Sequence, residues 1–258
     1  MTSRASGLSR RQFALMSASG LAPLVFGGAC QALGRAVAVS DGRLAFRPVT
    51  PAPSSPTLAS GRLGLESGRD AVVHVPASPA PGPLPLFVLL HGAGGSGEGV
   101  IKRLGPDLET ARLVVVAPDS RGATWDAIRS GFGPDVAFLD RALARVCERI
   151  AIDPARIVIG GFSDGASYAL SLGLINGDLF QRIVAFSPGF IVPGPDHGKP
   201  RIFVSHGTAD PILPIADTSR RLVPALTKLG YDVTFREFSG GHEIPPDIAK
   251  DALASMAG

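Results

Sequence analysis

The chain has 258 residues, of which 45% are hydrophobic and 18% charged, and its formal net charge is +3. This composition excludes a disordered chain and a collagen-like repeat, and two cysteines are too few for a disulfide-stapled scaffold or a multi-cysteine metal module. The length suits one α/β domain with short appendages. The small positive surplus would indicate a polyanionic partner only if the folded domain carried it.

The first 38 residues have the composition of an export signal. Arg10 and Arg11 precede residues 13–34, which contain no charged side chain but several Ser, Gly and Pro residues. A membrane-spanning helix needs about 20 strongly apolar residues, whereas a basic start followed by a short, weakly apolar segment is typical of a signal peptide. The arginine pair resembles the twin-arginine signature. We therefore predict a signal over 1–38 and a periplasmic or secreted protein; an uncleaved N-terminal helix is the alternative.

Two positions fit the end of this signal. Residues 36–38 read AVA, which matches the A-x-A cleavage pattern and would leave a chain that starts at Val39. Alternatively, Cys30 would be a lipid-modified first residue, although Gly27 stands where a branched aliphatic residue is usual. The expected partner of this segment is the export machinery, with a lipid anchor as the alternative outcome.

The signal also accounts for the positive charge. Residues 1–38 contain four arginines and no acidic residue, which leaves 21 basic against 22 acidic side chains in the rest of the chain. Because that remainder is nearly neutral, we expect no nucleic-acid partner. Residues 39–60 are expected to form a linker, since they include the Pro/Ser-rich stretch RPVTPAPSSPTLAS. The catalytic domain is predicted over residues 61–258.

From residue 61 onward, short apolar runs alternate with helical patterns. Edge strands are expected at Gly61–Leu65 and Ala71–Val75, uniformly apolar strands at Leu84–Leu90, Leu113–Pro118, Arg156–Phe162, Arg182–Ser187 and Arg201–Gly207, and an alternating strand at Asp232–Phe238. Helices are expected at Val136–Ile150, Ala166–Asn176, Thr218–Leu229 and Pro246–Met256. Uniformly apolar strands are buried on both faces. The pattern therefore predicts a doubly wound, mostly parallel α/β sheet flanked by helices, with ligands at the carboxyl ends of the strands.

Residues 161–165 read GFSDG, a G-x-S-x-G pentapeptide between a predicted strand and a predicted helix. In that context the glycines allow a sharp turn that exposes the serine hydroxyl at the edge of the sheet. Ser163 is therefore the candidate nucleophile. A glycine-rich turn with a capping serine is the alternative.

A serine nucleophile needs a base that a carboxylate orients. Of the five histidines, only His242 follows the penultimate predicted strand at a strand's carboxyl end, within SGGHE. Asp210 comes just after a buried strand and is the candidate acid. Its competitors are Asp217, which is expected to cap the next helix, and Glu243, which is too close to His242 in sequence to face its ring.

Residues 90–95, LHGAGG, end the first central strand. Ester cleavage places negative charge on the carbonyl oxygen, which backbone N–H groups must stabilise. The N–H groups of Ala93 and Asp164 are the candidate oxyanion donors. A phosphate-binding loop is a weaker reading, because the Lys-Ser/Thr of a P-loop and the G-x-G-x-x-G spacing are absent.

These segments resemble the α/β-hydrolase superfamily, and within it the phospholipase/carboxylesterase-type serine esterases, with some likeness to polyhydroxybutyrate-depolymerase-type esterases. The resemblance covers residues 61–256. It implies that the loop after the strand expected at Leu113–Pro118 borders the substrate pocket. Trp125 in this loop is therefore a candidate pocket wall, with core packing as the alternative. Residues 188–199 are too few for the large lid of many lipases.

The resemblance therefore implies a serine hydrolase that cleaves small carboxylic esters through an acyl-enzyme, without metal or organic cofactor. A thioesterase or peptidase with the same triad is the alternative within enzymes. From another class, a non-catalytic envelope binding protein on a hydrolase scaffold is the rival.

Overall fold

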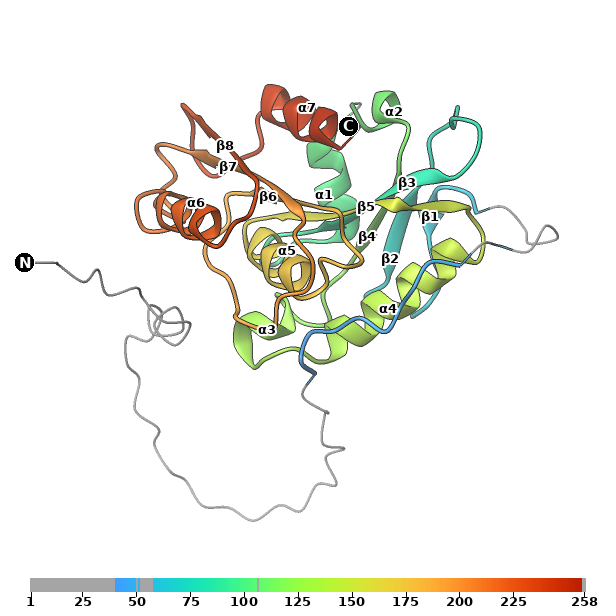
Figure 1. Ribbon diagram of the computed structural model, residues 1–258. Coiled ribbons are helices and arrows are strands. Elements are labelled where there is room, and N and C mark those ends of the chain that lie inside the picture. Colours follow the sequence, from blue (N-terminus) through green and yellow to red (C-terminus); the bar gives the residue numbers. More distant parts are fainter. Residues whose placement is uncertain (1–39, 50, 52–57, 106, 257–258) are drawn as a thin grey trace, which may run out of the picture. The chain divides into compact units, whose positions relative to one another are not determined.

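Eight strands form one sheet in the order β1-β2-β4-β3-β5-β6-β7-β8 within the part of the chain that the structure describes (Figure 1). The structure is a computed structural model and describes residues 40–49, 51, 58–105 and 107–256. The strands are β1 (Gly61–Arg62), β2 (Ala71–His74), β3 (Leu84–Leu90), β4 (Val114–Pro118), β5 (Ile152–Phe162), β6 (Arg182–Phe186), β7 (Arg201–Gly207) and β8 (Val233–Phe238). β2 pairs antiparallel with both of its neighbours, β1 and β4, and all later pairings in this order are parallel. The predicted doubly wound, mostly parallel sheet is therefore confirmed.

Helices cover both faces of this sheet (Figure 1). They are α1 (Gly97–Leu104), α2 (Asp107–Ala111), α3 (Asp126–Arg129), α4 (Pro134–Cys147), α5 (Asp164–Ile175), α6 (Ser219–Lys228) and α7 (Pro246–Ser255). Side chains of α1, α2 and α7 pack in one apolar core, and those of α3 to α6 pack in another. The sheet thus separates two cores, as in a three-layer α/β fold.

The uniformly apolar strands serve both cores at once. In β3, Leu86, Val88 and Leu90 belong to the core beneath α4 and α5, whereas Phe87 and Leu89 belong to the core beneath α1 and α7. All five side chains are fully buried. Because successive side chains of a strand point to opposite faces, a strand covered on both sides must be apolar at every position.

Some elements differ from the sequence-based expectation. The helices α1, α2 and α3 were not predicted, and β1 has two residues instead of five. The sequence of α1 contains two glycines in eight residues, which weakens its helical pattern. Its start is nevertheless marked by Ser96, whose hydroxyl accepts a hydrogen bond from the Gly99 N–H. In the described residues no helix is long and apolar enough to cross a membrane.

The predicted linker over residues 39–60 requires a correction at its start. Leu44 and Phe46 are buried in the core beneath α4 and α5. The Asp140 carboxylate accepts hydrogen bonds from the backbone N–H groups of Ala45 and Phe46. This segment is therefore part of the domain, because it buries two apolar side chains. The sequence did not reveal this, since the segment directly precedes a Pro/Ser-rich stretch that is typical of a linker.

The predicted export signal, with Cys30, lies outside the described residues, and its boundaries stay a prediction. The connection at residues 188–199 forms neither helix nor strand apart from one isolated bridge at Gly198. This short, irregular connection agrees with the expected absence of a large lid in this part of the described chain.

Candidate active site

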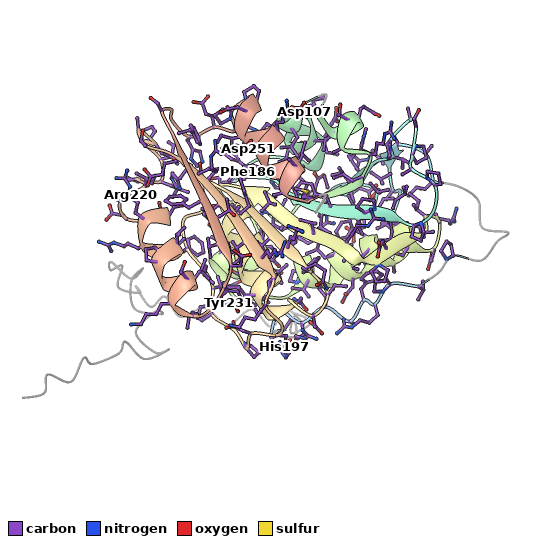
Figure 2. The ribbon with its side chains drawn as sticks, turned by 45° about the horizontal axis from the view of Figure 1, so that its top comes forward. Asp107, Phe186, His197, Arg220, Tyr231 and Asp251 are labelled. Atoms are coloured by element: carbon purple, nitrogen blue, oxygen red, sulfur yellow. The ribbon has the colours of Figure 1, made fainter. Side chains whose placement is uncertain are left out.

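Four parallel strands deliver the candidate site residues to one edge of the sheet. Ala93 follows β3, Ser163 follows β5, Asp210 follows β7 and His242 follows β8. All four lie beyond the carboxyl ends of their strands, whereas Tyr231 and His197 lie near the amino ends of β8 and β7 (Figure 2). A cleft of about 510 Å³ opens at the carboxyl edge, and Ala93, Ser163 and His242 line it. This is the position at which doubly wound sheets bind their ligands.

Ser163 occupies the sharp turn between β5 and α5. Its φ of 58° and ψ of −120° form a strained backbone conformation for a residue with a side chain. A Cβ at Gly165 would lie 2.3 Å from the carbonyl oxygen of Leu90, and one at Gly161 would lie 2.5 Å from the backbone of Gly165. Both flanking glycines are therefore required by close backbone approach, which explains the G-x-S-x-G pattern physically.

Asp210 and His242 form a short hydrogen bond. The His242 Nδ1 atom lies 2.6 Å from Asp210 Oδ2, while Asp210 Oδ1 accepts from the N–H groups of Ile212 and Leu213, each at 2.9 Å. Burial alone would raise the pKa of the Asp210 carboxyl, but these hydrogen bonds outweigh burial and hold its pKa below the ordinary value. Asp210 is therefore the charged acceptor that places the His242 proton on Nδ1 and leaves Nε2 as the basic nitrogen.

Backbone contacts hold the acid loop and the histidine loop together. The Thr208 N–H donates to the Phe238 carbonyl, and the Ala209 N–H donates to the Gly240 carbonyl at 3.0 Å. A Cβ at Gly207 would lie 2.2 Å from the Gly241 carbonyl oxygen. Small residues in both loops therefore allow the approach that brings the acid and the histidine into contact.

The competing acids do not face the His242 ring. Asp217 is exposed and lies 3.4 Å from Arg221. Its expected role as a helix cap is wrong, since Thr218 is the first flanking residue of α6 and no side chain caps that end. Glu243 accepts a hydrogen bond from the Gly241 N–H.

His206 supports the acid loop from the buried side. Its Nε2 lies 2.7 Å from the Leu213 carbonyl oxygen and 3.2 Å from Asp210 Oδ2, and its Nδ1 lies 2.7 Å from Ser219 Oγ. A carbonyl only accepts, so Nε2 carries the proton and Nδ1 accepts from the serine hydroxyl. Burial lowers the pKa of His206, which keeps a neutral ring behind the Asp210 carboxylate.

The candidate oxyanion donors lie on the two glycine-rich turns. Gly92 to Gly95 form a tight turn closed by a backbone hydrogen bond of 3.0 Å, and Asp164 is the first residue of α5. Within the described residues, the Ala93 N–H finds no acceptor, and the Asp164 N–H, as the first of its helix, has none either. A Cβ at Gly92 would lie 3.2 Å from the Ser163 Cβ, so the two turns are adjacent. Two free N–H groups therefore lie beside the candidate nucleophile.

His91 shapes the oxyanion turn from inside. Its Nδ1 lies 2.7 Å from the Gly92 carbonyl, and its Nε2 accepts a hydrogen bond of 2.9 Å from the Ser120 N–H. Burial lowers the pKa of this ring, which matches a neutral histidine with its proton on Nδ1. His91 therefore acts as a bridge between β3 and the loop after β4.

Trp125 does not form the predicted pocket wall. It is only 1% exposed and is absent from the cleft lining. Its Nε1–H donates a 2.9 Å hydrogen bond to the His91 carbonyl, and its ring stacks on Tyr168 with centroids 5.1 Å apart. The alternative of core packing is thus the observed one, because an indole in this loop gains both burial and a buried partner for its N–H.

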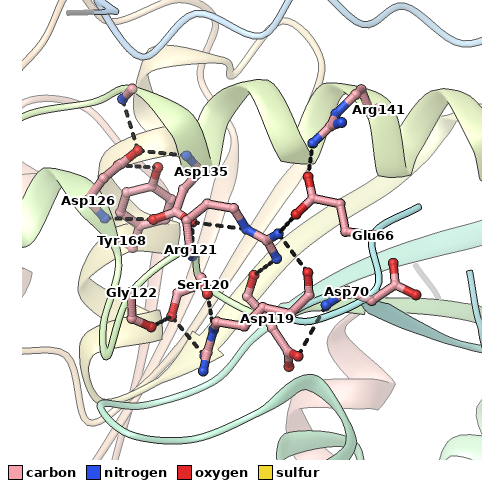
Figure 3. A network of polar contacts seen from close by, with 12 residues as sticks. Glu66, Asp70, Asp119, Ser120, Arg121, Gly122, Asp126, Asp135, Arg141 and Tyr168 are labelled. Carbon is pink, nitrogen blue, oxygen red and sulfur yellow. Dashed lines mark hydrogen bonds and ion pairs between the residues drawn. The ribbon is translucent and has the colours of Figure 1, made fainter. Parts of the chain in front are cut away.

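A polar network fixes the loop that carries Trp125 (Figure 3). The Asp135 carboxylate accepts from the N–H groups of Arg121 and Asp126 at 2.6 and 2.7 Å, and Asp126 Oδ1 accepts from the Tyr168 hydroxyl at 2.8 Å. Burial raises the pKa of Asp135 to about 6, although these hydrogen bonds favour the charged form. In the same loop Thr124 donates to the Asp164 carboxylate at 2.6 Å. The network therefore positions both oxyanion turns indirectly.

Sequence patterns alone did not identify three contributors to the cleft: Phe162, Arg103 and Ile212. Phe162 precedes the nucleophile and lies 4.7 Å from the His242 ring, centroid to centroid. Its position in the motif G-x-S-x-G is evident from the sequence, but its contact with His242 depends on how the loop after β8 folds. Among the described residues, no group of three or more potential ligands could hold a metal ion.

Comparison with known proteins identifies the family of this chain. A model of the phospholipase/carboxylesterase family matches residues 137–257, which include Ser163, Asp210 and His242. Feruloyl esterase C from Emericella nidulans is 30% identical over 186 residues, which cover 66% of this chain and 67% of that protein. Acyl-protein thioesterase 1 from Neurospora crassa is 36% identical over 99 residues, covering 34% of this chain and 39% of that protein.

A crystal structure described as esterase PE8 shares the fold, with a TM-score of 0.59 and 24% identity over 77% of this chain and 98% of that one. The chain spans about two thirds of the length of its feruloyl esterase relative. The sequence match with that relative, the family model and the doubly wound sheet agree. The chain belongs to the phospholipase/carboxylesterase family of α/β-hydrolases, a family of ester hydrolases.

Proposed function

We propose that this esterase cleaves carboxylic esters through an acyl-enzyme on Ser163. The observation that carries the proposal is the 2.6 Å contact between His242 and Asp210 at a cleft that Ser163 also lines. A serine, a basic imidazole nitrogen and a buried carboxylate, in that chain order, make up the nucleophilic machinery of α/β-hydrolases.

The reaction follows from these roles. Ser163 Oγ attacks the ester carbonyl while His242 Nε2 takes its proton, and the N–H groups of Ala93 and Asp164 bind the oxyanion. His242 then returns the proton to the leaving alcohol, and the same base activates the water that releases the acid. Each oxyanion donor is expected to contribute about 3 kcal/mol to the transition state. Asp210 stabilises the imidazolium that forms in each step.

Labelling by a fluorophosphonate probe tests the nucleophile. The wild-type protein should be labelled and should cleave 4-nitrophenyl acetate, and Ser163→Ala should abolish both. Ser205→Ala is a matched control, because Ser205 is a buried serine of β7 that does not line the cleft and whose hydroxyl has no hydrogen-bond partner among the described residues. An unlabelled wild-type protein without esterase activity would indicate a non-catalytic binding protein instead.

Thioesters are the second candidate substrate class, because the relative from Neurospora crassa is named an acyl-protein thioesterase. The same acyl-enzyme would form with a thiol as leaving group. Values of kcat/KM for an oxygen ester and a thioester of the same acyl chain decide between the two. We expect the oxygen ester to be preferred; a thioester preference of tenfold or more would reverse the assignment.

We also propose that residues 1–38 direct export through the twin-arginine route. This proposal rests on the arginine pair and on the uncharged stretch that follows it. Expression of the full chain should give a shortened protein outside the cytoplasm, and replacement of both Arg10 and Arg11 by lysine should retain the precursor inside. Fatty-acid incorporation that is lost in Cys30→Ala would identify the lipid anchor instead of cleavage after Ala38.

A further inference from the structure

The candidate cleft has a positively charged side chain and no negatively charged one in its described lining. Arg103, near the end of α1, is the one lining side chain with a permanent charge, and no carboxylate belongs to the described lining. Ile212, in the acid loop, also lines the cleft and is 65% exposed, one of the few large apolar side chains so exposed in the described part of the chain. The cleft that Ser163 and His242 line therefore also presents one cationic and one exposed apolar side chain.

Arg103 is held close to the reacting groups by an aromatic ring. Its Cζ atom lies 4.8 Å from the Phe162 ring centroid, and the His242 ring lies 4.7 Å from the same centroid. The Arg103 guanidinium and the His242 ring therefore both contact the ring of Phe162. Because Ser163 and Arg103 line the same cleft, one bound substrate can contact both.

The stacking also leaves the hydrogen-bonding capacity of Arg103 unused. Eleven other arginines of the described chain lie within 4 Å of a carboxylate, for example Arg43, Arg121 and Arg220, whereas no ion pair or hydrogen bond of Arg103 is found among the described residues. A guanidinium without a protein acceptor keeps its planar set of N–H donors available, and these match the two oxygens of a carboxylate or phosphate.

We propose that Arg103 binds a negatively charged group on the substrate, so that the preferred esters are anionic ones. This inference rests on the proposed ester hydrolysis at Ser163 and adds the substrate class. Ile212 then contacts an apolar part of the same molecule. A carboxylate or phosphate near the scissile carbonyl would hydrogen-bond to Arg103. Such charge-assisted hydrogen bonds are about twice as strong as neutral ones, which favours anionic over neutral esters.

Arg103 also lies in the last turn of α1, where a positive charge stabilises a helix. Lys102 shares that turn, is 73% exposed and pairs with Glu98, and it does not line the cleft. A purely structural role would therefore be common to both residues, whereas recognition of an anionic substrate belongs to Arg103 alone. Lys102→Gln is the matched control.

The experiment compares charged and neutral esters of matched shape. One pair varies the acyl side, 4-nitrophenyl hemisuccinate against 4-nitrophenyl pentanoate. The other pair varies the alcohol side and compares 4-acetoxybenzoate, which is charged, with methyl 4-acetoxybenzoate, which is neutral. Each kcat/KM ratio of charged to neutral ester is measured for the wild type, Arg103→Gln, Arg103→Lys and Lys102→Gln. The ratio is independent of the fraction of folded enzyme, since both substrates meet the same preparation.

We expect the wild type to prefer the charged ester about tenfold in at least one pair, which also tells which side of the ester carries the anion. Arg103→Gln should remove this preference, Arg103→Lys should keep part of it, and Lys102→Gln should preserve it. Cleavage of neutral esters without a charge preference in either pair, or a preference that survives Arg103→Gln, overturns the inference while the esterase assignment stands. Failure to cleave any ester would instead contradict the proposed function.

Discussion

The half of the domain that begins at α4 holds its site turns together through backbone hydrogen bonds, whereas the half before α4 holds its site turn through side-chain hydrogen bonds. Ser163, Asp210 and His242 lie in the turns after β5, β7 and β8, and backbone hydrogen bonds join these turns to neighbouring strand ends and loops. By contrast, Ala93 depends on His91, whose carbonyl is held by Trp125 in another loop. The candidate nucleophile and its partners are thus determined by strand order, and the oxyanion turn by a polar network.

The difference has a physical cause. A βα turn at the end of a parallel strand needs few residues, because the sheet already determines where the chain emerges. The loop after β4 instead runs through irregular structure, and its backbone groups need side-chain partners such as the carboxylates of Asp126 and Asp135. We therefore expect substitutions in the later half to change chemistry, and those in the earlier half to change chemistry and stability together.

The largest expected effect is that of Asp210→Asn. An amide at this position would favour the wrong tautomer of His242, so kcat should fall by about 10⁴ with the fold intact. Steady-state kinetics and circular dichroism would measure the two quantities. Asp217→Asn is the matched control, since it removes an exposed carboxylate of the same connection. Near wild-type activity in Asp210→Asn would assign the acid role to another residue.

The next effect concerns Asp135 and pH. Its pKa is raised to about 6 in the folded protein from an ordinary 3.8, so the folded state binds the proton more tightly than the unfolded state. This group therefore lowers the free energy of unfolding as pH rises from about 4 to 6, by up to about 3 kcal/mol, and contributes no further slope above that range.

Urea unfolding at several pH values measures this contribution as the difference between the wild type and Asp135→Asn. The difference should change across pH 4 to 6 and stay level from pH 7 to 8. A constant difference over the whole range would show that the carboxyl titrates normally. Other carboxyls, such as Asp178 with a pKa lowered to about 2 by its hydrogen bond to Arg43, act equally in both proteins and cancel.

The smallest effect is expected for Trp125→Phe. The phenyl ring keeps much of the stacking on Tyr168 but loses the N–H that donates to the His91 carbonyl. One unmade buried hydrogen bond should cost about 1 kcal/mol of stability and lower kcat about fivefold through the displaced oxyanion turn. Tyr168→Phe removes a hydroxyl that contacts Asp126 instead, so it should affect thermal stability more than kcat. Equal kcat values for Trp125→Phe and wild type would show that the hydrogen bond from Trp125 does not position the oxyanion turn.

The strands and the larger helices were predictable because their signals are local. The apolar runs of β3 to β7 and the spaced apolar residues of α4 need no knowledge of their partners. The helix α1 escaped prediction because its glycines obscure the pattern, and it carries Arg103. The buried segment at Leu44 escaped because two apolar side chains in a polar stretch become a core only against α4 and α5.

The sequence by itself determined the fold class, the sharp turn that carries Ser163 and the order of the three candidate catalytic residues, since strand periodicity, glycine spacing and chain order are properties of neighbouring residues. Only the tertiary structure decided that Trp125 lies behind the oxyanion turn rather than in the cleft, and that Arg103 faces Phe162 beside His242. Both depend on contacts between loops far apart in the chain, and no local pattern encodes which of these loops meet.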